Sequence, residues 1–135
     1  MKHTAHLFLI PVLAFAASSV VAADAPAGYP NRPIRFIAPF VAGGPSDMIS
    51  RLLGQKLTES WGQTVVVDNR GSAGGIIGTE IAAQALPDGY TLLTCNFATH
   101  GLNPAAYRKL PYDPLKDFAP VAMIGTAPSI LAVHP

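Results

Sequence analysis

Apolar positions along the chain follow two spacings, and each spacing predicts a different kind of element. Between Ser46 and Trp61, apolar residues recur every three or four positions with polar residues between them, which predicts an amphipathic helix. A second helical pattern runs over 76–86 and is broken by a Pro-Asp-Gly turn. Short runs rich in β-branched and aromatic residues predict strands over 34–40, 64–68 and 90–94.

Strands and helices therefore alternate with short connections, which predicts an α/β fold with a parallel sheet and right-handed crossovers. The run 64–68 is apolar on both faces, so we expect it to be the central strand. Two more strands are predicted over 121–126 and 129–133, with a helical turn near 115–117.

The ends of the first helix carry recognisable signals. Ser46 is expected to cap its first turn, and Asp47 to favour its positive end. Gly62 is expected to end the helix in the left-handed conformation.

The first 23 residues have the pattern of a cleavable secretory signal peptide. Lys2 precedes an uncharged stretch over 7–21, and small residues close it at Ala23. The stretch is shorter than the roughly 20 residues that a membrane-spanning helix needs. An uncleaved anchor is the alternative, which Pro11 and the lack of a following basic flank disfavour. We expect export, cleavage after Ala23 and no membrane anchor afterwards.

The charge of the remaining chain argues against several partners. The whole chain has nine Lys and Arg against eight Asp and Glu, so removal of Lys2 leaves eight of each. There is no basic run and no basic amphipathic helix, so nucleic acid and a membrane surface are not expected partners. The single cysteine, Cys95, is expected to be a small buried apolar residue.

Loops that leave the carboxyl ends of parallel strands meet at one edge of the sheet, where ligands bind. Three predicted loops qualify, over 39–46, 69–75 and 95–101. The first two place glycines directly before helices, so open backbone N–H groups can face a carboxylate or a phosphate. The alternative is that the glycines only form tight turns and allow close packing.

The residues argue against nucleotide binding and catalysis. The glycines from Gly71 to Gly78 do not have the dinucleotide spacing, and neither glycine loop has the lysine of a P-loop. An exported hydrolase using Ser46 or Ser72 with His100 is a second hypothesis, but there is no Gly-x-Ser-x-Gly motif. No carboxylate pair and no metal-ligand spacing are evident. We expect a binding protein without a cofactor and not an enzyme.

Five sequence blocks, over 29–34, 39–47, 67–75, 87–93 and 103–121, together resemble the Bug family of extracytoplasmic receptors for tripartite tricarboxylate transporters. The resemblance implies a periplasmic-binding-protein-like (type II) fold with two hinged domains around a small carboxylate. It also implies that the chain is a fragment, in which 24–126 are part of the N-terminal domain and 127–135 begin the crossover to a missing second domain.

The resemblance further implies a periplasmic receptor that is a monomer when full length and hands its ligand to membrane transporter subunits. A module that presents its ligand to a sensor protein is the alternative. The implied ligand contacts come from the three loops and are Phe40, Ala42, Gly43, Gly44, Pro45, Ser46, Ser72, Gly74, Gly75, Asn96, Ala98, Thr99 and His100.

Overall fold

A three-stranded parallel sheet forms the middle of the molecule in the computed structural model, which describes residues 28–126, 128, 131 and 133. The strands are β1 (Ile34–Ala38), β2 (Val65–Asn69) and β3 (Thr91–Leu93), in the order β2-β1-β3. In this register Phe36 lies opposite Val67 on one side and Leu92 on the other. The predicted α/β class and parallel sheet are confirmed, whereas the predicted signal peptide lies outside the described residues.

The central strand is β1 and not β2, so the expectation for 64–68 was wrong. Ile34, Phe36 and Ile37 are almost completely buried, while Val66 of β2 is 51% exposed. Both crossovers return the chain next to β1, one on each side. β1 therefore has a hydrogen-bonded neighbour on both edges, and β2 has only one in the described structure.

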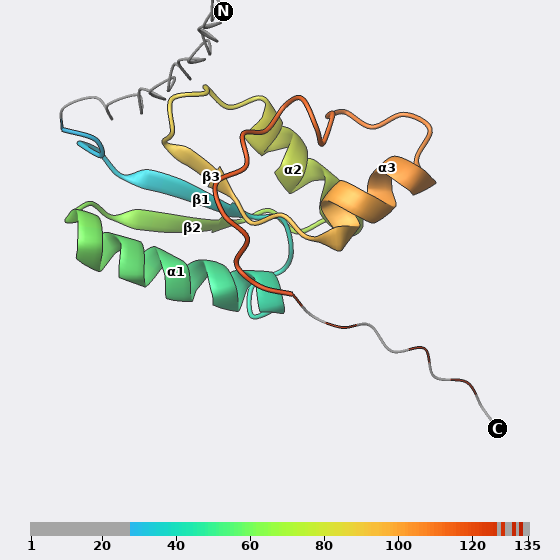
Figure 1. Ribbon diagram of the computed structural model, residues 1–135, viewed down its shortest axis with the longest axis horizontal. Helices are drawn as coiled ribbons and strands as arrows, with labels where there is room; N and C mark the ends of the chain where they lie inside the picture. Colours follow the sequence, from blue (N-terminus) through green and yellow to red (C-terminus); the bar gives the residue numbers. More distant parts are fainter. Residues whose placement is uncertain (1–27, 127, 129–130, 132, 134–135) are drawn as a thin grey trace, which may run out of the picture.

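Helices cover both faces of the sheet (Figure 1). α1 (Pro45–Trp61) packs on one face against β2 and β1. α2 (Ile76–Ala83) packs on the other against β1 and β3. The predicted end of α1 is confirmed, because Gly62 is left-handed at φ 67° and its N–H donates to the Thr58 carbonyl.

Short helical turns follow the second loop and the third strand. A 3₁₀ turn, η1 (Ala73–Gly75), leads into α2, which ends at Ala83, earlier than the sequence pattern suggested. A π-helical turn, η2 (Ala98–Leu102), runs directly into α3 (Asn103–Ala106). These turns lie at the carboxyl end of the sheet (Figure 1).

The chain after α3 forms no strand among its described residues. The strand predicted over 121–126 was wrong, because Val121 and Met123 are 85% and 83% exposed and have no neighbouring strand. An apolar run becomes a strand only where a partner supplies its hydrogen bonds. The strand predicted over 129–133 lies mostly outside the described residues. The predicted turn near 115–117 is present, and the Asp117 N–H donates to the Asp113 carbonyl.

Cys95 is exposed, contrary to the expectation from its apolar neighbours. β3 ends at Leu93, so Cys95 lies beyond the strand and away from the core. In the described ranges, no helix is long and apolar enough to cross a membrane. The same residues contain no group of three or more His, Cys, Asp or Glu arranged for a metal ion.

Candidate functional site at the carboxyl edge of the sheet

The loops after β1, β2 and β3 leave the sheet at one edge, as predicted from the parallel topology (Figure 1). Backbone hydrogen bonds hold their first residues in place. The Arg70 N–H donates to the Ala38 carbonyl at 2.9 Å, and the Thr94 N–H donates to the Ile37 carbonyl at 3.0 Å. The second and third loops therefore begin on either side of the first.

Gly75 is the point where the three loops meet. It is buried and left-handed, with φ of 83°. A Cβ atom at this position would lie 2.8 Å from Thr99 Cγ2, 3.1 Å from Phe40 Cζ and 3.2 Å from the Pro39 carbonyl oxygen. Those three neighbours come from the third loop and the first, so only glycine lets the second loop approach both.

Gly71 makes a second close approach between the first two loops. A Cβ atom there would lie 2.8 Å from the Val41 backbone nitrogen and 3.0 Å from the Phe40 carbonyl carbon. Gly71 and Gly75 therefore allow the loops to pack closely, which is the alternative explanation that the sequence analysis gave for the glycines. Gly43 differs, because its Cβ position is open and its left-handed φ of 82° marks a turn.

Ser46 does not cap α1, contrary to the sequence-based expectation. The helix begins at Pro45, and its cap residue is Gly44, two residues before Ser46 and without a side-chain hydrogen bond. Proline is favoured in the first turn because its missing N–H has no helical partner there anyway. Ser46 is consequently inside the helix and is only 8% exposed.

Asp47, in the first turn of α1, holds the turn that precedes the helix. Its carboxylate accepts the Gly43 N–H at 2.8 Å and pairs with Arg51 one helical turn later. The hydrogen bonds from Arg51 and from the Gly43 N–H hold the pKa of the Asp47 carboxyl below its usual value. An ionised carboxylate therefore already occupies the positive end of α1, and the Gly43 N–H is not free for a ligand.

The second loop has an unusual backbone. Ala73, Gly74 and Gly75 have successive φ angles of 34°, 69° and 83°, so three consecutive residues are left-handed. For Ala73 this costs about 1–2 kcal/mol, and such strain is concentrated at functional sites. The Gly75 N–H donates to the Ser72 carbonyl, whereas the N–H groups of Ala73 and Gly74 have no acceptor in the described part of the chain.

Ser72 begins this turn, and its hydroxyl oxygen is buried without a hydrogen-bond partner among the described residues. Gly74 is exposed, and its carbonyl accepts a hydrogen bond from the Asn103 side chain. The second loop thus presents unpaired N–H groups on an anchored and strained backbone. This arrangement suits an anionic group.

Most polar side chains of the third loop form hydrogen bonds within that loop. Asn96 Oδ1 accepts the N–H groups of Ala98 and Thr99, so it caps the following turn. Thr99 is completely buried, and its hydroxyl donates to the Asn96 carbonyl.

His100 is half-buried, with Nδ1 3.0 Å from Thr99 Oγ1 and its ring 5.0 Å from that of Phe118. Burial lowers the pKa of the imidazole. Thr99 is the side chain that contacts the ring nitrogen, and no hydrogen bond joins His100 to Ser46 or Ser72 in the described structure. The serine–histidine pair required by the hydrolase hypothesis is not assembled there.

Asn103 and Tyr112 support the site but were missed by the sequence analysis. Asn103 Nδ2 donates to the Gly74 carbonyl at 3.0 Å and to the Tyr112 hydroxyl at 3.3 Å. The Tyr112 hydroxyl donates to the Thr99 carbonyl at 2.6 Å. Both residues lie in a block that carried the family resemblance, but nothing in the pattern indicated that they join the second and third loops.

The structure brings the thirteen candidates to one edge but exposes them unequally. Ala42, Gly43, Pro45, Gly74 and Asn96 are exposed, Phe40, Gly44, Ser72, Ala98 and His100 are half-buried, and Ser46, Gly75 and Thr99 are buried. Two shallow hollows of the described structure lie away from these loops, one around 104–114 and one along β1 and β2. Because five of the thirteen candidates are exposed, the candidate site lies at an open edge of the described structure, with backbone donors.

Comparison with known proteins identifies related chains. A family model described as the tripartite tricarboxylate transporter family receptor matches residues 49–135. BugT of Bordetella pertussis is 42% identical over 123 residues, which cover 90% of this chain and 38% of BugT.

Two solved structures from Rhodopseudomonas palustris are also similar. MatC, solved with bound malate, is 38% identical with a TM-score of 0.68, and the match covers 71% of this chain and 33% of MatC. A second protein, solved with adipate, is 37% identical with a TM-score of 0.62, and the match covers 64% of this chain and 29% of that protein. The chain thus spans about a third of the length of these relatives.

Proposed function

The chain belongs to the tripartite tricarboxylate transporter receptor family, and from this premise we propose that it captures a small carboxylate at the carboxyl edge of its sheet for a membrane transporter. The family consists of binding proteins without enzymatic activity, so the expectation of a non-enzyme is confirmed. The chemistry of the ligand is inferred from relatives whose structures contain malate and adipate.

One observation carries the proposal for the site. The Ala73 and Gly74 N–H groups have no acceptor in the described structure, and they lie in the strained second loop directly before α2. A carboxylate offers these donors the acceptor that they lack, and bonds to a charged acceptor are the stronger kind. Exposed Ala42 in the first loop and exposed Asn96 in the third complete the proposed contact surface.

Burial in the structure suggests which candidate residues contact the ligand and which only hold the loops in place. Ser46, Gly75 and Thr99 are buried, so we assign them to holding the loops together. Asp47 is a carboxylate beside the proposed anion site, and Arg51 offsets its charge. Its position favours binding through the second loop over binding at the start of α1.

Export is part of the proposal. Similar solved structures are described as a periplasmic transporter and the periplasmic binding protein BugD. We propose that residues 1–23 are removed as a signal peptide and that residues 24–126 belong to the first of two ligand-binding domains. Cell fractionation followed by mass determination of the N-terminus tests both export and the cleavage position.

Calorimetric titration of the chain with malate, adipate and citrate tests the binding function. Gly74→Ala adds a Cβ atom 3.2 Å from Asn103 Oδ1 at a left-handed φ of 69°, so we expect at least tenfold weaker binding, about 1.4 kcal/mol. Gly62→Ala is the matched control, because its φ is 67° and its Cβ position is open. Equal binding by both variants would contradict the second loop as the site, and product formation from any of the acids would contradict a receptor.

A further inference from the structure

Ala73 has a backbone conformation that favours glycine. It and Gly74 are the central residues of a turn that the Gly75 N–H closes onto the Ser72 carbonyl at 2.6 Å, and their φ angles are 34° and 69°. Turns with two left-handed central residues are dominated by glycine, asparagine and aspartate. Such strain persists only where the surrounding structure holds it. A contact from elsewhere in the fold must therefore favour this turn over one in which Ala73 has a negative φ.

Asn103 supplies a contact that depends on this conformation. Its Nδ2 donates to the Gly74 carbonyl at 3.0 Å, and a Cβ atom on Gly74 would lie only 3.2 Å from its Oδ1. The Gly74 carbonyl belongs to the same peptide group as the Gly75 N–H, which is bonded to the Ser72 carbonyl. This peptide group is thus held at both ends, and rotating it breaks both hydrogen bonds.

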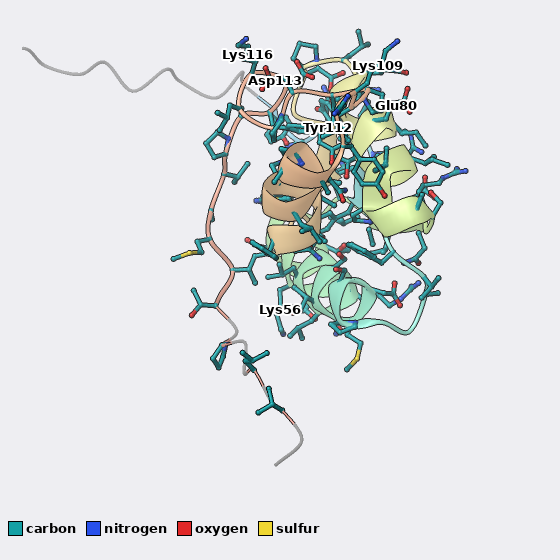
Figure 2. All side chains as sticks on the ribbon, turned by 90° about the vertical axis from the view of Figure 1, so that its right-hand side faces the viewer. Lys56, Glu80, Lys109, Tyr112, Asp113 and Lys116 are labelled. Carbon is teal, nitrogen blue, oxygen red and sulfur yellow. The ribbon has the colours of Figure 1, made fainter. Side chains whose placement is uncertain are left out.

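The orientation of the Asn103 amide is itself fixed. Asn103 begins α3 and is 3% exposed, and its Nδ2 also donates to the Tyr112 hydroxyl at 3.3 Å. Tyr112 lies beside α3 (Figure 2), is 5% exposed, and donates to the Thr99 carbonyl at 2.6 Å. Both N–H groups of the amide are therefore engaged. The reverse orientation would place Oδ1 against the Gly74 carbonyl, oxygen against oxygen.

We infer that Asn103 and Tyr112 are positioning residues for carboxylate binding, because they hold the turn over 72–75 in the conformation that presents the Ala73 and Gly74 N–H groups to the ligand. This inference rests on the proposed function and adds residues that set its affinity without touching the ligand. Without these two side chains, the turn populates a second conformation in which Ala73 is relaxed and the N–H groups point elsewhere. The apparent affinity falls with the fraction of molecules that keep the binding conformation.

Calorimetric titration of the full chain with malate, adipate and citrate measures the effect on affinity. We expect the dissociation constant to rise about fivefold for Asn103→Ala and about twofold for Tyr112→Phe, which leaves the bond to Gly74 in place. Tyr90→Phe is the matched control, because the Tyr90 hydroxyl also accepts one bond and donates one, both with Asn31. Tyr90 directly precedes β3, at the opposite end of the sheet from the three loops, so this variant should bind as the original chain does.

A second substitution separates positioning from a general loss of structure. Ala73→Gly removes the strain, because glycine adopts a positive φ without a steric penalty. The double variant Asn103→Ala with Ala73→Gly should therefore bind to within about twofold of the original chain. A residue that only stabilised the fold would show no such rescue. If Asn103→Ala does not fold, Tyr112→Phe with and without Ala73→Gly carries the same test.

Relaxation-dispersion NMR of the ligand-free proteins tests the turn without any ligand. Asn103→Ala should show exchange broadening at the Ala73 and Gly74 amides that Tyr90→Phe lacks. Unchanged affinity of Asn103→Ala, failure of Ala73→Gly to restore binding, or absence of the broadening would each overturn the positioning role while the proposed function stands. An original chain that binds none of the three acids would contradict the proposed function, even where the broadening shows that Asn103 holds the turn.

Discussion

Replacement of Gly75 by alanine tests whether the three loops converge as the structure shows. Gly75 has φ of 83° and ψ of 8°, and a Cβ atom there would lie 2.8 Å from Thr99 Cγ2 and 3.1 Å from Phe40 Cζ. Gly62 offers a matched comparison, because its φ and ψ are 67° and 10° and nothing lies within 4 Å of its Cβ position. The two positions share a backbone conformation and differ in crowding.

The expected loss of stability has two parts. The left-handed conformation costs a non-glycine residue about 1–2 kcal/mol, and this part applies to both variants. Overpacking against backbone and buried side chains adds about 1–3 kcal/mol, and this part applies only at Gly75. We therefore expect Gly75→Ala to lower the free energy of unfolding by about 2–5 kcal/mol, and Gly62→Ala by only the first part.

Urea denaturation followed by the fluorescence of Trp61, the chain's single tryptophan, measures both variants. An unchanged slope with urea concentration makes the midpoints directly comparable. If the two variants lose the same free energy to within about 0.5 kcal/mol, the close packing of the three loops at Gly75 is refuted.

Two other predictions concern the start of α1. Ser46→Ala should change the free energy of unfolding by less than about 0.5 kcal/mol in thermal or urea melts, because Ser46 makes no cap bond. A loss near about 1 kcal/mol would instead show that Ser46 caps the helix. The depressed pKa of Asp47 means that its ionised form stabilises the folded state. This contribution should be present above the unfolded-state pKa of about 3.9 and lost as pH falls through the lower folded-state pKa. The Asp47→Asn variant should therefore have a lower free energy of unfolding than the original chain at pH 7, and should lose less of it as the pH falls below 4. If the free energy of unfolding of the two proteins depends on pH in the same way, this role of Asp47 is refuted.

The order of elements from β1 to β3 was predictable because it depends on local patterns. The spacing in α1 and the β-branched residues of β2 identified each element without knowledge of its neighbours. Because parallel strands send their carboxyl ends to one edge, the meeting of the three loops also followed. The strand order did not follow, because Val65 to Val67 would suit either a central strand or a covered edge strand.

The roles of individual site residues depended more on contacts between residues that are far apart in the sequence. Ser46 and Gly44 are both acceptable cap residues, and Pro45 shifted the start of α1 to leave Ser46 inside it. Asn103 holds the Gly74 carbonyl from 29 positions away, a partnership that no local spacing indicates. Cys95 lost its expected burial because β3 ends two residues earlier.

The sequence by itself determined the α/β class, the edge where the loops gather and the family resemblance, since each depends on residue types along a continuous stretch. Only the tertiary structure decided that β1 is central, that Asp47 occupies the start of α1, and that the second loop retains unpaired N–H groups. The reason is physical: hydrogen-bond satisfaction and crowding at a Cβ position depend on atoms brought together across the fold. The sequence spacing of Gly75 cannot reveal that Thr99 and Phe40 lie against it.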